Sequence, residues 1–251
     1  MRWFQGALLT RPPRLLHRLL PGAEWRAPAA GPDGRPRLYL TFDDGPVPEE
    51  TPWVLAQLAR YQARATFFCV GDNLARHPAI ARAALAAGHR LANHTHHHRS
   101  AWQTPRAEYL ADVARCQQAL SLLAVGSQPL AVGSAAKSPK LTANSQQLIA
   151  NTNQQLIANE KPLFRPPYGR LTWPLLRALR AEYRVVLWSV LTRDYDPRLP
   201  PKDCLRLTLA TARAGDILVF HDSRKASARL RYVLPNVLAY FARRGFEFAA
   251  L

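Results

Sequence analysis

Short apolar runs with strand character alternate with amphipathic helical patterns along most of this chain, and that alternation limits the folds open to it. The predicted strands cover residues 38–43, 65–70, 89–94, 184–190, 216–222 and 246–251. The predicted helices cover residues 50–61, 77–88, 106–123, 172–183, 201–215 and 229–245, the last interrupted by Pro235. Strand–helix alternation with short connections is typical of a parallel sheet covered by helices, and about seven units of this kind predict a barrel or a distorted barrel. In such barrels the chemistry gathers at the carboxyl ends of the strands.

The first predicted strand ends in two adjacent carboxylates. The sequence YLTFDDGP leads from apolar residues directly to Asp43 and Asp44 and stops at Gly45-Pro46. Like charges repel, and each carboxylate is costly to remove from water. The rest of the chain must therefore supply something that compensates this charge.

A histidine-rich stretch follows a second strand end. The sequence NHTHHHRS holds His94, His96, His97 and His98, of which the first and last are four residues apart. On a helical turn these two would share a face and could bind one metal ion, with His96 and His97 facing elsewhere. Two histidines, one of the two aspartates and a water would form an open catalytic site of the zinc type, and the other aspartate would serve as general base. The competing interpretation is a histidine-rich tract that binds metal adventitiously.

Three further segments carry polar or aromatic residues of interest. Arg165 in LFRPPYGR precedes two prolines and could hold a carboxylate through a bidentate contact. Trp188 and Asp194 lie in LWSVLTRDY, and His221 ends the strand in ILVFHDS. A histidine oriented by an aspartate is suited to be a general acid near neutral pH.

Composition sets wider limits. The length of 251 residues fits one large domain, and the 48% hydrophobic fraction is that of a globular protein. The net charge of +17 fits either a coding bias toward arginine or attraction to an anionic surface. The three cysteines indicate neither a disulfide framework nor a zinc knuckle. No helix-turn-helix or zinc-finger pattern supports nucleic-acid binding.

Two segments stand apart from the alternation. Residues 1–36 are expected to be an extension that packs on a domain formed by residues 37–251, with no cleavable signal peptide and no transmembrane segment. This leaves open whether the protein is cytoplasmic or peripherally associated with the envelope. Residues 125–160 contain short tandem repeats, and we expect an inserted, disordered surface loop at the bottom of the barrel, away from the active face.

Taken in order, these motifs resemble the polysaccharide deacetylase family, also known as carbohydrate esterase family 4 or the NodB homology domain. The resemblance rests on TFDDG, H-T-x-x-H, R-P-P-Y, W-S-x-x-x-x-D-Y and the strand-end histidine, and it runs from about Arg37 to Leu251 apart from the insertion. It implies an α/β fold with a distorted (β/α)7-type barrel. The implied activity is hydrolytic removal of N-acetyl or O-acetyl groups from sugars with one divalent metal ion, most often Zn²⁺, with Co²⁺ and other ions as alternatives.

The resemblance also implies roles for individual residues. The metal ligands would be Asp44, His94 and His98. Asp43 would be the base held by Arg165, and His221 would be the acid, which Asp194 would orient or whose pKa it would raise. The backbone N–H of Tyr168 would stabilise the oxyanion, and Tyr168, Trp188 and Tyr195 would line the sugar site.

Other functions fit parts of the same pattern. A non-catalytic carbohydrate-binding relative of the barrel would keep the fold, but Asp43 and His221, whose loss would signal it, are both present. Two histidines and a carboxylate also form the iron site of non-haem oxygenases, although the chain lacks their run of short strands. The expected partner is an acetylated glycan such as a chitin oligomer or peptidoglycan, bound by a monomer.

Overall fold

The computed structural model describes residues 10–125 and 160–251. Its strands are β1 (Arg37–Asp43), β2 (Ala65–Cys69), β3 (Arg90–Asn93), β4 (Leu163–Phe164), β5 (Arg184–Val185), β6 (Val190–Leu191), β7 (Ile217–His221) and β8 (Glu247–Phe248). Its helices are α2 (Arg14–His17), α3 (Glu50–Ala59), α4 (Gly71–Arg76), α5 (Pro78–Ala86), α6 (Arg106–Val125), α8 (Trp173–Glu182), α9 (Pro201–Thr211) and α10 (Ser227–Ala242), with a short 3-10 turn η1 (Pro167–Gly169).

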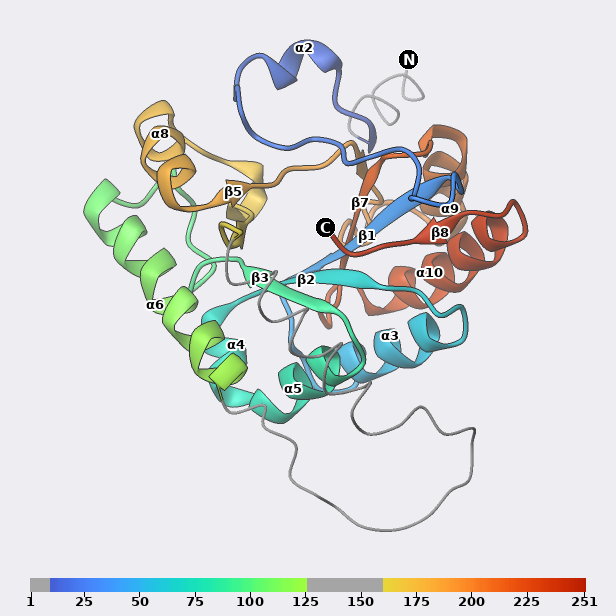
Figure 1. The fold of residues 1–251 in the computed structure, drawn as a ribbon, viewed down its shortest axis with the longest axis horizontal. Coiled ribbons are helices and arrows are strands. Elements are labelled where there is room, and N and C mark those ends of the chain that lie inside the picture. Colours follow the sequence, from blue (N-terminus) through green and yellow to red (C-terminus); the bar gives the residue numbers. More distant parts are fainter. Residues whose placement is uncertain (1–9, 126–159) are drawn as a thin grey trace.

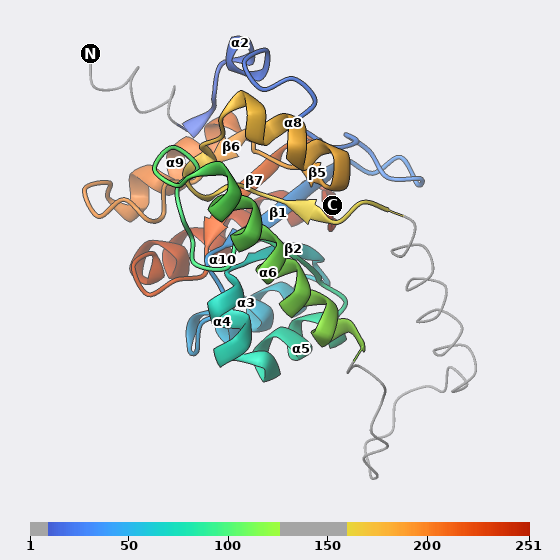
Figure 2. The same cartoon turned by 90° about the vertical axis from the view of Figure 1, so that its left-hand side faces the viewer.

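The strands form one parallel sheet in the order β5-β4-β3-β2-β1-β7-β6, with β8 added beside β1. The sheet curls on itself, and helices α8, α6, α4, α5, α3, α10 and α9 surround it (Figure 1). Turned by 90°, the molecule shows α6 and α8 crossing the side of the sheet (Figure 2). The predicted α/β fold with a distorted barrel is confirmed.

The central strand β1 has the longest apolar run, and its burial follows from its position. Residues Leu38 to Asp43 are all buried, because helices cover one face and the barrel interior covers the other. The ring of Phe42 stacks between Phe67 of β2 and Phe220 of β7, with centroids 5.0 Å and 5.5 Å away. These contacts fix how the three strands lie against one another.

The register of β1 and β7 determines which polar groups meet. Asp43 lies opposite His221 on β7 and opposite Phe68 on β2. Because parallel strands end at the same edge of a sheet, the last residues of β1 and β7 share one end of the barrel. The register therefore brings one carboxylate and one imidazole to the same place.

The predicted strand over residues 184–190 is wrong as a single element. The structure has two strands there: β5 pairs with β4 and β6 pairs with β7, so they are the two opposite edges of the sheet. The chain between them crosses the opening of the barrel, where Glu24 forms an isolated bridge with Val186. The apolar run over residues 185–188 conceals this break, because the crossing residues Val186 and Leu187 are as buried as a strand would be.

Other boundaries differ in smaller ways. Helix α9 ends at Thr211, before the predicted limit, because Ala212 is already extended and Gly215 lies in a left-handed turn (φ 82°). Helix α10 continues through Pro235, since Leu234 and Val237 on either side remain packed in the core. Helix α4 was not predicted.

The segment before β1 contacts the barrel through ion pairs, among other contacts. Arg11 forms an ion pair with buried Asp216 at 2.6 Å, and Glu24 pairs with Arg184 at 2.8 Å. Most of the predicted insertion, residues 126–159, lies outside the described residues. In the described part of the chain, no helix combines the length and apolar character needed to cross a bilayer.

Candidate active site

Three potential metal ligands meet at the carboxyl ends of β1 and β3. Asp44 follows β1 directly, and His94 and His98 follow β3. Asp44 Oδ1 lies 3.2 Å from His98 Nε2 and 3.9 Å from His94 Nε2. One ligand atom from each residue lies within 4.8 Å of the other two, which is the spacing of a mononuclear metal site.

The two histidines do not share a helical turn, contrary to the prediction. Residues 94–98 form a loop in which Thr95 (φ 65°) and His98 (φ 55°) adopt left-handed backbone conformations. Asp112 on α6 holds this loop: its Oδ2 accepts hydrogen bonds from the amides of His96 and His97, each at 3.0 Å, and its Oδ1 pairs with the His97 ring. The His97 ring is thus turned toward α6, whereas His98 faces Asp44.

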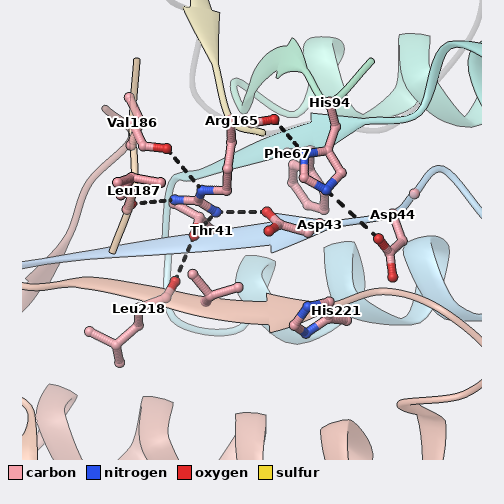
Figure 3. Close-up of polar contacts among 12 residues, drawn as sticks. Thr41, Asp43, Asp44, Phe67, His94, Arg165, Val186, Leu187, Leu218 and His221 are labelled. Atoms are coloured by element: carbon pink, nitrogen blue, oxygen red, sulfur yellow. Dashed lines mark hydrogen bonds and ion pairs between the residues drawn. The ribbon is translucent and has the colours of Figure 1, made fainter. Parts of the chain in front are cut away.

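The protonation of the cluster suits a cation. The Nδ1–H of His94 donates to the Arg165 carbonyl at 2.8 Å, which leaves Nε2 directed at Asp44 (Figure 3). Burial lowers the pKa of His94 to about 4, so its ring is neutral near pH 7. Burial alone would raise the pKa of Asp44, but the hydrogen bond from His98 and the nearby imidazoles hold it far below its ordinary value. A neutral imidazole and an ionised carboxylate are the forms that bind metal, and the donor set fits a divalent ion.

The second aspartate has a different environment. Arg165 Nη1 donates to Asp43 Oδ1 at 2.6 Å and to Thr41 Oγ1 at 2.7 Å, and all three side chains are buried (Figure 3). The remaining guanidinium donors reach the carbonyls of Val186 at 3.4 Å and Leu187 at 3.0 Å. These carbonyls belong to the crossing between β5 and β6. Arg165 therefore has two roles: it binds the chain that crosses the barrel opening, and it compensates the charge of Asp43.

His221 is paired with Asp194. Its Nδ1 lies 2.8 Å from Asp194 Oδ1, and its amide donates to Oδ2 at 2.8 Å. Arg229 donates to the Asp194 carbonyl at 2.6 Å and holds the loop in place. Burial alone would lower the pKa of His221, but Asp194 and then Asp44 outweigh burial and raise this pKa to about 9. The ring is thus protonated near pH 7.

Three aromatic residues surround these groups. The Tyr168 ring packs edge-on against His98 with centroids 4.8 Å apart, and its backbone is left-handed (φ 61°). The Tyr195 ring packs edge-on against His221 at 4.9 Å. Trp188 is half-buried beside Gly169: a Cβ on that glycine would lie 2.4 Å from the indole, so only glycine fits. The aromatic residues therefore flank both the metal cluster and the histidine.

Sequence reasoning missed two buried carboxyls at the site. Asp222 accepts hydrogen bonds from the Gly45 amide at 3.1 Å and the Thr51 hydroxyl at 2.5 Å, and burial raises its pKa to about 8. It anchors the turn after Asp44. Because Asp222 follows His221 directly in the sequence, its place at the site could have been predicted. Asp112 gave no such signal, because an acidic residue within a helix is usually exposed.

Comparisons with known proteins identify relatives of this site and fold. The sequence profile of the family described as polysaccharide deacetylase matches residues 30–143. A chitooligosaccharide deacetylase from Bradyrhizobium sp. is 31% identical over 230 residues, which cover 85% of this chain and 88% of the relative. A peptidoglycan-N-acetylglucosamine deacetylase from Bacillus cereus is 26% identical over 222 residues, covering 88% of both chains.

Solved structures agree. A family 4 carbohydrate esterase from Streptomyces lividans, in complex with acetate, has a TM-score of 0.61 and 26% identity, and the match covers 84% of this chain and 90% of that one. The peptidoglycan deacetylase PdaC from Bacillus subtilis has a TM-score of 0.65 at 23% identity, covering 86% and 88%, and supports the fold.

The barrel, the metal-ligand cluster and these relatives define a metal-dependent hydrolase that removes acetyl groups from polysaccharides. The chain belongs to the polysaccharide deacetylase family. The curated relatives named above are deacetylases and this chain has both Asp43 and His221, so the non-catalytic alternative is disfavoured.

Proposed function

We propose that this enzyme removes the acetyl group from N-acetylglucosamine units of a glycan of the peptidoglycan or chitooligosaccharide type, with Zn²⁺ as its metal. The observation that carries the proposal is the meeting of Asp43 and His221, opposite each other in register, beside the Asp44–His94–His98 cluster. A base, an acid and a cation site at one strand end are what hydrolysis of an amide requires. The substrate class follows the names of the relatives.

The metal would be held by Asp44, His94 and His98. When bound, a divalent ion supplies Lewis-acid activation of water and of the acetyl carbonyl. Two imidazoles and one carboxylate favour Zn²⁺, with Co²⁺ as a functional substitute.

The chain's own residues would move the protons. Asp43, held by the hydrogen bond from Arg165, would accept the proton of the attacking water. His221, protonated through its pairing with Asp194, would donate a proton to the departing amine. The Tyr168 amide would donate a hydrogen bond to the oxygen that gains charge during attack.

The sugar would be positioned by aromatic side chains. Tyr168 packs edge-on against His98 and Tyr195 packs edge-on against His221, so the two rings lie at different sides of the reacting groups at the same end of the barrel. Trp188, packed against Gly169, would complete the wall. Flat apolar sugar faces pack well on rings of this kind.

The experiment is release of acetate from chitotetraose, peptidoglycan and acetylated xylan. The purified protein is first stripped with chelator and then reloaded with Zn²⁺, Co²⁺ or Mg²⁺. We expect acetate from the first two substrates after loading with Zn²⁺ or Co²⁺ and none from the stripped protein. Acetate from xylan alone would show an O-deacetylase and reject the N-acetyl substrate.

Two further proposals concern organisation. We propose that residues 1–36 form an extension on a domain of residues 37–251, supported by the Arg11–Asp216 and Glu24–Arg184 pairs. We also propose a monomer, which light scattering coupled to size exclusion would test.

A further inference from the structure

Next to the metal cluster, one arginine is held between two exposed aromatic rings. The Arg170 guanidinium carbon lies 4.8 Å from the centre of the Trp102 ring and 5.4 Å from that of the Tyr168 ring. The Trp102 indole N–H donates to the Leu171 carbonyl at 3.2 Å, which fixes the indole against the Arg170 segment. Both rings are more than half exposed, at 63% and 60%. Stacking of this kind holds a guanidinium in place and leaves its edge free.

The charge of Arg170 is not neutralised nearby. Within residues 10–125 and 160–251, its guanidinium forms no ion pair with a carboxylate and donates no hydrogen bond to another group. Within the same described residues, Arg82 on α5 is also exposed, and its guanidinium likewise forms no ion pair and donates no hydrogen bond. No aromatic ring there contacts it. Arg170 differs from Arg82 because the rings of Trp102 and Tyr168 hold its guanidinium in place.

The position of Arg170 relates it to the reaction. Tyr168, on which it stacks, packs in turn against the metal ligand His98 at 4.8 Å. Tyr168 is exposed and packs on His98, so a glycan whose acetyl group reaches the metal cluster can lay its next sugar over this surface. Arg170 is thus placed to meet a neighbouring sugar.

The same surface continues away from the site as a cationic groove. Between the starts of α6 and α8, the groove is lined by Arg106, Trp173 and Arg177, together with Pro174 and Ala178. Figures 1 and 2 both show the beginning of α6 beside α8. Neither Arg106 nor Arg177 has an ion-pair partner in the described part of the chain. The two charged residues that line the groove, Arg106 and Arg177, are both cationic, which complements an acidic chain.

We propose that Arg170 binds a carboxylate on the sugar next to the acetylated one, so that the enzyme prefers glycans with free sugar carboxylates, such as peptidoglycan strands without stem peptides, over neutral chitin oligomers. The inference rests on the proposed deacetylase function and specifies its substrate. A planar guanidinium forms two parallel hydrogen bonds to a carboxylate, whereas a neutral N-acetylglucosamine neighbour offers no matching group.

The test uses one glycan in two charge states. The first substrate is a peptidoglycan tetrasaccharide whose alternate sugars carry lactyl carboxylates, and the second is the same tetrasaccharide with those carboxylates converted to methyl amides. We expect the Zn²⁺-loaded parent enzyme to favour the acid by roughly 10- to 100-fold in kcat/KM, the range for a hydrogen-bonded charge. Arg170→Gln should bring the two substrates to within about 2-fold, and Arg170→Lys should retain part of the preference.

Matched controls separate this inference from the function on which it rests. Arg82→Gln removes an equal charge elsewhere and should keep the preference, and Zn²⁺ affinity by calorimetry should be unchanged in Arg170→Gln. A parent enzyme that treats acid and amide alike, or an Arg170→Gln variant that slows both equally, overturns the inference while leaving the deacetylase intact. No acetate from either tetrasaccharide or from chitotetraose would instead reject the proposed function.

Discussion

Arg165 Nη1 lies 2.6 Å from Asp43 Oδ1, with the arginine side chain fully buried. The same guanidinium also binds the carbonyls of Val186 and Leu187 at the opening between β5 and β6. One side chain thus holds the Asp43 carboxylate and closes the sheet, and its loss should affect both.

Replacing this arginine tests that double role. Arg165→Met leaves Asp43 buried without its cation, and breaking a buried ion pair in this way costs about 3–5 kcal/mol. Urea unfolding should show that loss in free energy of unfolding. The double variant Arg165→Met/Asp43→Asn should recover part of it, because no unpaired charge remains. A single variant with unchanged stability would contradict the structural part of the role.

The two neighbouring aspartates should respond differently to amidation. Asp43→Asn should keep the metal and lose roughly 10²–10⁴ in rate, the range of a general-base contribution. Asp44→Asn should bind metal more weakly, so excess Zn²⁺ should partly restore its rate. Elemental analysis and acetate release across a metal titration measure both, with His77→Ala as a control outside the cluster. Rescue of Asp43→Asn in place of Asp44→Asn would reverse the two roles.

The His221–Asp194 pair predicts the pH dependence of catalysis. The pKa of His221 is raised to about 9 because Asp194 outweighs burial. In Asp194→Asn burial remains and the carboxylate is gone, so the alkaline limb of the kcat/KM profile should move to lower pH by more than one unit, toward the ordinary value of 6.5 or below. An unmoved limb would mean that another group donates the proton.

The His221–Asp194 pair should also make the free energy of unfolding depend on pH. The folded pKa of about 9 exceeds the ordinary value of 6.5, so the stabilisation is fully present below 6.5 and is lost as pH rises toward 9. The deficit of Asp194→Asn relative to the parent should therefore be larger at about pH 6 than at about pH 9.5 in urea unfolding. A deficit that grows with pH would contradict this sign.

Asp112 should act on the metal through the loop that carries two of its ligands. Asp112→Ala removes the acceptor of the His96 and His97 amides, and loss of such supporting hydrogen bonds typically costs 10- to 100-fold in metal affinity. Calorimetric titration of Zn²⁺ into the stripped protein measures it. Asp72→Ala, which removes a carboxylate from the neighbouring helix α4, provides a comparison that should bind normally.

The features of the fold and the site that depend on local sequence pattern could be predicted from the sequence. The buried runs of β1 and β7 and the adjacent aspartates at a strand end are visible in YLTFDDGP and ILVFHDS. The division of residues 184–190 into two edge strands could not be, since an apolar run looks the same whichever neighbour it pairs with. Asp112 and Asp222 were missed for a related reason: their partners are distant in sequence and are set by tertiary packing.

The facing positions of Asp43 and His221 on adjacent strands have a consequence for folding accuracy. Side chains alternate between the two faces of a strand, so sliding β1 by one residue along β7 until Asp43 took the place of Phe42 would drive the carboxylate into the apolar layer between Phe67 and Phe220. The backbone ladder tolerates that error far better than the buried charges do. Under the roles proposed for Asp43 and His221, proton transfer therefore depends on correct strand alignment, and acetate release is also an assay for molecules that have paired β1 and β7 in the native register.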